Sequence, residues 1–442
     1  MTELFFLLTQ FFLIYILASF NFLEVSIKDK KKNILSYPEN IAFNLIIFTN
    51  FILIISFFNF NLDIIIKSYI AYIIILGLFY LHKFKNVTIL NEERIFYFLL
   101  LFVSSMIIFI EVANNLALGW DVQKFWIYKT LNFYNGNSIE NLSNIAHSWY
   151  PHLGTLIWSF FWKLSLINYE YFGRLFYVFL YLSSLLLLVY NFRLSKFYKT
   201  IFFISLIIIS YDYSYHSLWS MFSGYQEILI FSLLTISIHF LYNLTLKNKK
   251  RENLNILSII LICNSLIWIK HEGMIISLSL ILTLILFFDF NKRKKTIIFF
   301  SFFLIIFLRF FIFDIYDLNS SGIQHSNYSN LELKEILGKI SLDRIFIVSK
   351  FLLLNLFSNY LFLIAILILA ILKLKNKKLK KMNYFFFLII FNILAFSGIY
   401  IITDADIIVM LKQGLDRIIY QFSPFVFLLF LTVFNNKRIN LS

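Results

Sequence analysis

Long apolar runs, each separated from the next by a short polar stretch, fill most of this chain. A helix needs about 20 consecutive apolar residues to cross a bilayer. Runs close to that length lie at 4–22, 41–60, 64–82, 95–118, 172–192, 200–215, 227–246, 254–269, 274–290, 296–315, 349–372, 383–402 and 418–434. The pattern therefore predicts an all-α polytopic membrane protein with about 13 transmembrane helices.

Basic residues gather in clusters between these runs, and the clusters predict the orientation of the chain. They are Lys28–Lys32, Lys83–Lys85, Arg193–Lys199, Lys247–Arg251, Lys292–Lys295, Lys373–Lys381 and Lys437–Arg438. Because loops rich in Lys and Arg stay in the cytoplasm, we place every cluster there, with the N-terminus outside. The segments predicted to face the outer side of the cytoplasmic (inner) membrane are then 119–171, 216–226, 270–273, 316–348 and 403–417.

Segment 150–166, YPHLGTLIWSFFWKLSL, is also apolar enough to cross the membrane. A full crossing here would move the later basic clusters to the outer side. We therefore expect a short interfacial or re-entrant helix within the outer loop 119–171, with Trp158 and Trp162 at the depth of the headgroups. The alternative is a true span, with one of the later runs not crossing.

Composition excludes several other classes of protein. Of the 442 residues, 60% are hydrophobic and 14% are charged, whereas a soluble domain has about 25% charged residues. A net charge of +15 would suggest a nucleic-acid partner for a soluble protein, but these charges lie in short loops, so we expect none. The run at 4–22 lacks a basic flank and a small-residue cleavage site, which predicts a retained span. The single cysteine, Cys263, cannot form an internal disulfide.

The first outer segment begins LALGWDVQKFWIYK, residues 116–129, with an acid directly after a long apolar run. Counting in fours places Asp121, Phe125 and Lys129 on one face of a helix. Trp126 adds an amphipathic ring suited to an interface. We expect a helix lying on the membrane that holds the Asp121 carboxylate above the bilayer edge, where it could take a proton from an attacking hydroxyl. The simpler alternative is an acid that only ends a span in water.

Two further motifs lie in the outer segments. In HSWYPHLG, residues 147–154, the proline suits the first turn of the next helix, and we predict that His147 and Tyr150 line the same cavity as Asp121. In SGYQE, residues 223–227, Glu227 begins a span. A helix N-terminus stabilises a carboxylate there, so Glu227 has either that structural role or the role of a second acid in the cavity.

The last two motifs supply cations. Lys270, His271 and Glu272 stand between two apolar runs with almost no loop, an arrangement that costs free energy unless the charges are solvated or paired. We predict that Lys270 meets an anionic lipid headgroup while Glu272 orients it or binds an acceptor; a tight outer turn is the structural alternative. Asp416 and Arg417 precede the final run, and an arginine can bind phosphate through two parallel hydrogen bonds.

These motifs, in this order, resemble bacterial membrane glycosyltransferases of the GT-C superfamily. The similarity consists of GWD with Trp126 and Lys129, then H..YP, GY.E at a span start, K.EG, and LDR before the last span, over about residues 115 to 430. It extends to dolichyl-phosphate-mannose protein mannosyltransferases and lipid A sugar transferases. The chain departs from the family pattern at Glu227, usually Asp, and at His271, usually Asn.

The resemblance implies a fold and a reaction. Residues 95–442 would form a GT-C-like transmembrane catalytic region, and residues 1–94 would hold extra N-terminal transmembrane helices. A polyprenyl-phosphate sugar would be the donor, with its phosphate held by Arg417 and Lys270 and by Lys129. Asp121 would be the base that activates a hydroxyl of a glycan, lipid or protein acceptor, with inversion at the anomeric carbon. Trp126, His147, Tyr150, Glu227, His271, Glu272 and Asp416 would line the cavity.

No cofactor and no metal site is implied, although the question of a divalent metal stays open. Two other functions also stay open at this point. A lipid-linked oligosaccharide ligase or polymerase would also act at the outer face, and it would need a larger outer loop, for which 316–348 is the later candidate. A non-enzymatic lipid or sugar transporter would instead place charges deep inside its spans and show internal symmetry.

Overall fold

The computed structural model describes residues 35–83, 92–165, 168–192, 194–210, 221–246, 251–318, 338–374, 383–403 and 406–435. These residues form helices and connecting turns, with no strand among them. The helices are α3 (Tyr37–Ser56), α4 (Leu62–Lys83), α5 (Glu92–Asn114), α6 (Ile127–Tyr134), α7 (Leu153–Leu164), α8 (Tyr171–Tyr190), α9 (Lys196–Ser210), α11 (Glu227–Thr245), α12 (Glu252–Ile269), α13 (Glu272–Phe287), α14 (Lys292–Ile315), α17 (Leu342–Ser358), α18 (Tyr360–Leu374), α19 (Asn383–Ile402), α20 (Ile407–Phe422) and α21 (Phe425–Asn435), with a π-helical turn at Val122–Trp126 and a 3-10 turn at Glu140–Asn144.

Within the described ranges, 9 helices are long and apolar enough to cross a membrane, where α20 and α21 together count as one. The prediction of a multi-pass, all-helical membrane protein is therefore confirmed, while the count of about 13 spans stays a prediction. The run at 4–22 lies outside the described residues. The runs at 200–215 and 274–290 correspond to α9, with 15 residues, and α13, with 16.

The run at 349–372 is not one straight helix. It is divided between α17 and α18, whose axes differ by 85°. Asn359 at the break has an extended backbone, and its side-chain oxygen accepts hydrogen bonds from the N–H groups of Leu361 and Phe362. An apolar run predicts burial in lipid. It does not show where one helix ends and the next begins, which here depends on a single capping residue, Asn359.

The segment 403–417, expected as an outer connection, is mostly helix. Asp406 caps α20 by accepting from the N–H groups of Ile408 and Val409 at 2.9 and 3.2 Å, so the final apolar helix begins well before residue 418. Pro424 lies between α20 and α21, where the missing proline N–H removes no helical hydrogen bond.

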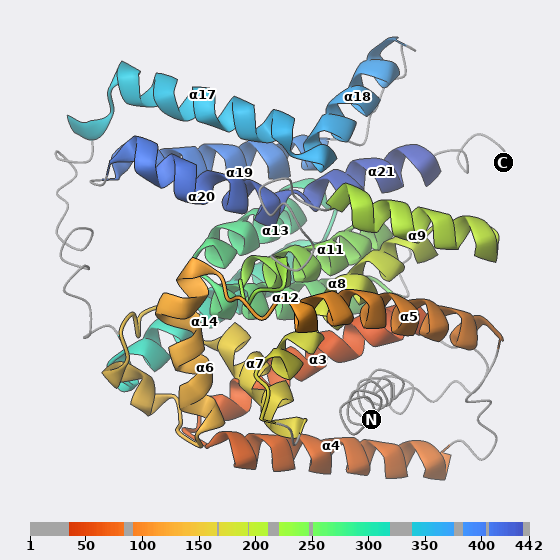
Figure 1. Ribbon diagram of the computed structural model, residues 1–442. Helices are drawn as coiled ribbons and strands as arrows, with labels where there is room; N and C mark the ends of the chain where they lie inside the picture. Colours follow the sequence, from red (N-terminus) through yellow and green to blue (C-terminus); the bar gives the residue numbers. More distant parts are fainter. Residues whose placement is uncertain are drawn as a thin grey trace.

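The central helix of the bundle is α8, whose apolar window is buried along its whole length. It packs against α3, α5, α7 and α11, while α11 also packs against α12, α20 and α21. Figure 1 shows α4 along one side of the molecule and α17 along the opposite side, with α8, α11 and α12 between them. The outlying helix α14 exposes Phe300, Phe303 and Phe307, as expected for a surface that faces lipid.

Segment 150–166 contains α7, which has 12 residues and is therefore shorter than a span. Trp158 is fully buried, and its ring N–H donates to the backbone oxygen of Glu170 at 2.9 Å. Trp162 is also buried and stacks on Tyr134 of α6, with ring centroids 3.9 Å apart. The helix packs within the protein, against α6 and α8. Its predicted interfacial position stays a prediction.

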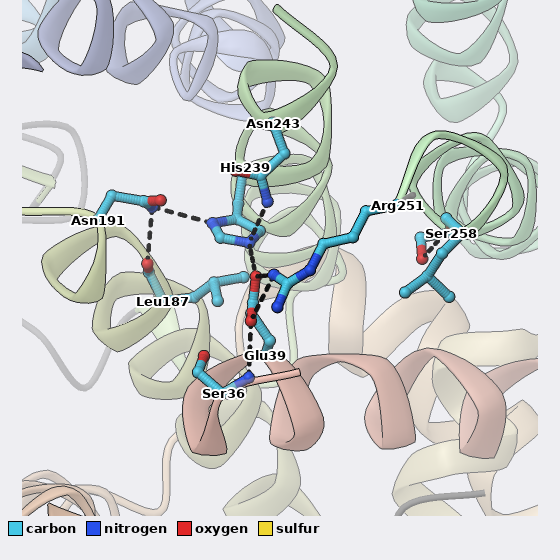
Figure 2. Close-up of polar contacts among 9 residues, drawn as sticks. Ser36, Glu39, Leu187, Asn191, His239, Asn243, Arg251 and Ser258 are labelled. Carbon is cyan, nitrogen blue, oxygen red and sulfur yellow. Dashed lines mark hydrogen bonds and ion pairs between the residues drawn. The ribbon is translucent and has the colours of Figure 1, made fainter. Parts of the chain in front are cut away.

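The first described helix, α3, is an integral part of the bundle, since most of it is buried. At its first turn, Glu39 accepts hydrogen bonds from His239 at 3.1 Å and from Arg251 at 3.1 and 3.3 Å. Figure 2 shows how this carboxylate joins α3 to α11 and to the start of α12. Asn191, which follows α8, donates to the other ring nitrogen of His239. This cluster shows a structural role for one of the helices before residue 95.

Replacing Glu39 with alanine should lower the free energy of unfolding by about 3 kcal/mol, because the buried His239 and the partly exposed Arg251 would lose their shared carboxylate. The measurement is an unfolding titration in detergent. Ser258→Ala is a matched control, since its hydroxyl donates within α12 to Leu254, and its unfolding midpoint should equal that of the wild type. Equal midpoints for both variants would show that the cluster does not stabilise the fold.

Candidate functional site

A cavity of about 600 Å³ brings together residues from the turn after α5, from the segment before α7, and from α11, the α12–α13 junction, α19 and α20. Its polar and ionisable lining includes eight of the residues predicted from the sequence, with Trp126 among them. They are Asp121, Trp126, Tyr150, Glu227, Lys270, His271, Glu272 and Arg417. The three other predicted residues, Lys129, His147 and Asp416, do not line this cavity.

Five charged side chains in the cavity form one continuous set of ion pairs. Arg417 contacts the carboxylate of Asp121 and lies 3.5 Å from Glu227. Lys270 lies 3.0 Å from the same oxygen of Glu227 and 3.1 Å from Glu272. Glu227 is 1% exposed and therefore lies between the two cations with almost no solvent contact. Each charge is thus stabilised by at least one opposite charge, which a weakly hydrated site requires.

Lys270 lies between the end of α12 and the start of α13 and is buried. Burial alone would lower the pKa of its ammonium group, but the carboxylates of Glu227 and Glu272 outweigh that effect and raise the pKa above its ordinary value. Lys270 is therefore a permanent cation at neutral pH. Burial also raises the pKa of Tyr150 to about 12, so this phenol stays neutral and can donate a hydrogen bond.

The position of Asp121 depends on two close approaches of the backbone. Gly224 has a φ of +94°, and a Cβ at this residue would meet Trp158 and Val122 at 2.6 Å. The N–H of Gly119 donates to the backbone oxygen of Ser223 at 3.2 Å. The GWD and SGYQE motifs are therefore held side by side, and glycine is needed at residue 224 because other residues disfavour this backbone conformation.

Tyr225 connects the junction of the GWD and SGYQE motifs to the ion-pair network. Its ring occupies the space in which a side chain at Gly119 would lie, with a ring carbon 2.2 Å from an ideal Cβ there. The Arg417 guanidinium lies 5.4 Å from the centre of the same ring, a distance suited to a cation–π contact. Tyr225 therefore orients Arg417 as well as packing against the GWD turn.

The turn after Asp121 is a π-helix, Val122–Trp126, in which the N–H of Ile127 donates to the oxygen of Val122. This wider turn changes the register that counting in fours assumes. Phe125 still lines the cavity beside Asp121, but Lys129 does not. The single helical face predicted for Asp121, Phe125 and Lys129 is therefore wrong at Lys129.

Lys129 is fully buried and binds backbone instead. Its Nζ donates to the oxygens of Ser148 and Tyr150 at 3.1 and 2.5 Å. Burial lowers its pKa well below the ordinary value. This lysine fixes the segment that carries Tyr150, so its position supports a structural role and not the phosphate contact predicted from the sequence.

His147 and Asp416 lie close to the cavity without lining it. The His147 ring packs edge-on against Phe125, with centroids 4.2 Å apart, on a backbone with a φ of 60°. Asp416 accepts a hydrogen bond at 2.7 Å from the backbone N–H of Arg417. His147 thus packs on a side chain of the cavity, Phe125, whereas Asp416 binds the backbone of Arg417.

Arg309 is a site residue that the sequence reasoning missed. It comes from α14 and is 4% exposed. One of its nitrogens donates to the oxygen of Ile267 at 2.9 Å, and another lies 2.6 Å from Nδ1 of His271. Because arginine only donates, Nδ1 must accept, which places the proton of the neutral ring on Nε2. A charge in the interior of the apolar run 296–315, at residue 309, was the available signal.

Much of the remaining wall is apolar, and it includes Met274 and Ile275 of α13, Phe396 and Ile399 of α19, and Met410 and Ile418 of α20. Thr403, Gln413 and Gln421 add uncharged polar groups to the lining. A ligand in this cavity would therefore meet paired charges as well as aliphatic and aromatic surface. Among the described residues, no group of three or more His, Cys, Asp or Glu side chains could hold a metal ion.

Lys129→Met tests the structural role of this lysine. Two buried carbonyls would lose their donor, so the free energy of unfolding should fall by about 1–3 kcal/mol, measured in detergent. Lys124→Met, at an exposed position in the preceding turn, is the control and should leave the free energy of unfolding unchanged. Wild-type stability of Lys129→Met would show that this lysine does not have the structural role.

The chain was also compared with known proteins. No family model, no curated protein and no solved structure matches it.

Proposed function

We propose that this protein is a glycosyltransferase of the cytoplasmic membrane that transfers a sugar from a polyprenyl-phosphate donor to an acceptor hydroxyl at the outer face. The observation that carries the proposal is the composition of the cavity. It combines an acid, Asp121, with two cations, Arg417 and Lys270, and with an apolar wall. A lipid-linked phosphosugar has the same three parts, namely a reacting sugar, an anionic phosphate and an apolar tail.

In the proposed reaction, Arg417 and Lys270 hold the phosphate of the donor, and the lipid tail lies along α13, α19 and α20. The acceptor oxygen attacks the anomeric carbon from the side opposite the phosphate. The carbon–oxygen bond to phosphate breaks, and the lipid phosphate leaves with the electron pair. Asp121 takes the proton of the acceptor hydroxyl. The two cations stabilise the charge that develops on the leaving group, and the configuration at the anomeric carbon inverts.

The positions of the charges favour this function over transport. Asp121 follows α5, Glu227 begins α11, and Lys270 and Glu272 flank the α12–α13 junction. These four are therefore residues of helix ends that meet in one cavity, where Arg417 joins them from within α20. A transporter would instead need charges distributed along a pathway through its spans. A ligase or polymerase would use the outer segment 316–348, most of which, 319–337, lies outside the described residues.

Asp121→Asn should abolish transfer while leaving folding and membrane insertion intact, because an amide cannot accept the proton but occupies nearly the same volume. Loss of general-base catalysis alone costs about 10²–10⁴-fold in rate. The measurement is transfer of labelled sugar from polyprenyl-phosphate donors by membranes that contain equal amounts of each variant.

Asp63→Asn is the control for this experiment. Asp63 forms a surface ion pair at 3.5 Å with Lys163, outside the cavity, so this variant should transfer at the wild-type rate. Transfer at the wild-type rate by Asp121→Asn would show that Asp121 is not the base.

A further inference from the structure

Both cations of the cavity already hold carboxylates. Arg417 contacts Asp121 and Glu227, and Lys270 contacts Glu227 and Glu272. The three acids and two cations of this network carry a formal charge of −3 + 2 = −1. An incoming phosphate therefore meets no excess of positive charge from these five groups. Both carboxylates contact the same nitrogen of Arg417, Nη1, so a phosphate that binds this nitrogen must take the place of a carboxylate.

The two carboxylates on Arg417 are not equally easy to displace. Glu227 is buried, and its side chain is also held by Lys270 at 3.0 Å. Removing it from the cations would leave a buried acid without compensation, at a high cost in free energy. The Asp121 side chain is 21% exposed and belongs to a short turn ahead of the π-helix. Asp121 can therefore turn toward solvent or toward a substrate, whereas Glu227 stays in place.

We propose that the phosphate of the donor displaces Asp121 from Arg417, so that the base becomes available only when the donor is bound. This inference rests on the proposed function. A phosphate is suited to replace the Asp121 carboxylate. It offers the guanidinium group the same pair of acceptor oxygens, and it carries more negative charge. No covalent bond changes in this step.

The exchange couples binding to chemistry. While the guanidinium donates to Asp121, one oxygen of that carboxylate is occupied and is not available to the hydroxyl of an acceptor. After the exchange, the carboxylate is free beside the sugar that the same phosphate carries. The donor should therefore bind before the acceptor is activated. A site without donor should not activate water or an acceptor hydroxyl.

The exchange makes an unusual prediction, namely that removing the base strengthens donor binding. In Asp121→Asn, Arg417 keeps its guanidinium but loses its exchangeable carboxylate. The affinity for a sugar-free polyprenyl phosphate in detergent or nanodiscs should then rise roughly fivefold or more, the range of a typical coupling between two ligands of one site. The measurement is a direct binding titration of the purified full chain.

A double-mutant cycle with Arg417→Gln distinguishes exchange from a general effect of charge. In the Arg417→Gln background, Asp121→Asn should not raise the affinity for polyprenyl phosphate, because there is no guanidinium group to release. Glu272→Gln is a matched control, since its side chain has a similar exposure, 22%, but contacts Lys270 and not Arg417. Any rise in the affinity for polyprenyl phosphate that Glu272→Gln causes should persist in the Arg417→Gln background.

The outcomes separate this inference from the proposed function. Unchanged or weaker binding of polyprenyl phosphate by Asp121→Asn, in a variant that has lost transfer, would overturn the exchange and leave the glycosyltransferase proposal intact. A rise in affinity that Asp121→Asn still causes in the Arg417→Gln background would also overturn the exchange. Transfer at the wild-type rate by Asp121→Asn would refute the assignment of the base and, with it, the coupling.

Discussion

The pairing of charges in the cavity is the constraint on which the rest of the site depends. A charged side chain at the level of the membrane is costly unless it is paired or solvated. Glu227 meets this constraint for two cations at once, because the same oxygen lies 3.0 Å from Lys270 and 3.5 Å from Arg417. The start of α11, the end of α12 and the middle of α20 are thereby fixed relative to one another. The apolar packing of the bundle brings these helices together, but the ion pairs define their polar ends.

The backbone departs from regular helix at three places where the chain reaches this network. The π-helical turn follows Asp121, Gly224 adopts a positive φ, and the chain is extended at Lys270, between α12 and α13. Such backbone is tolerated at membrane depth only where it is buried in protein or lines a cavity. The same irregularities direct functional side chains inward. Departures from regular helix are therefore part of how this site is built.

The sequence predicts the long elements well and the local geometry poorly. Uninterrupted apolar runs identify helices such as α8 and α11, because burial in lipid demands both an apolar surface and internal backbone hydrogen bonds. The order of the short motifs also indicated which side chains meet, and Asp121, Glu227, Lys270 and Arg417 do line one cavity. Lys129 was misplaced because one π-turn shifts the register. The bend at Asn359 and the role of Arg309 depend on single side-chain contacts, which periodicity does not encode.

The two residues that differ from the GT-C pattern that the sequence resembles, Glu227 and His271, each contact a cation. Glutamate at residue 227 is one methylene longer than aspartate, and from the first turn of α11 its oxygen reaches both Lys270 and Arg417. Histidine at residue 271 offers its ring nitrogen Nδ1 as an acceptor to Arg309 of α14. An asparagine at this residue would have only its side-chain oxygen as an acceptor. A shorter acid at residue 227 would leave one cation with fewer partners, and Arg417 would then depend more strongly on Asp121. In the proposed exchange, the length of residue 227 would therefore set how readily Asp121 leaves Arg417.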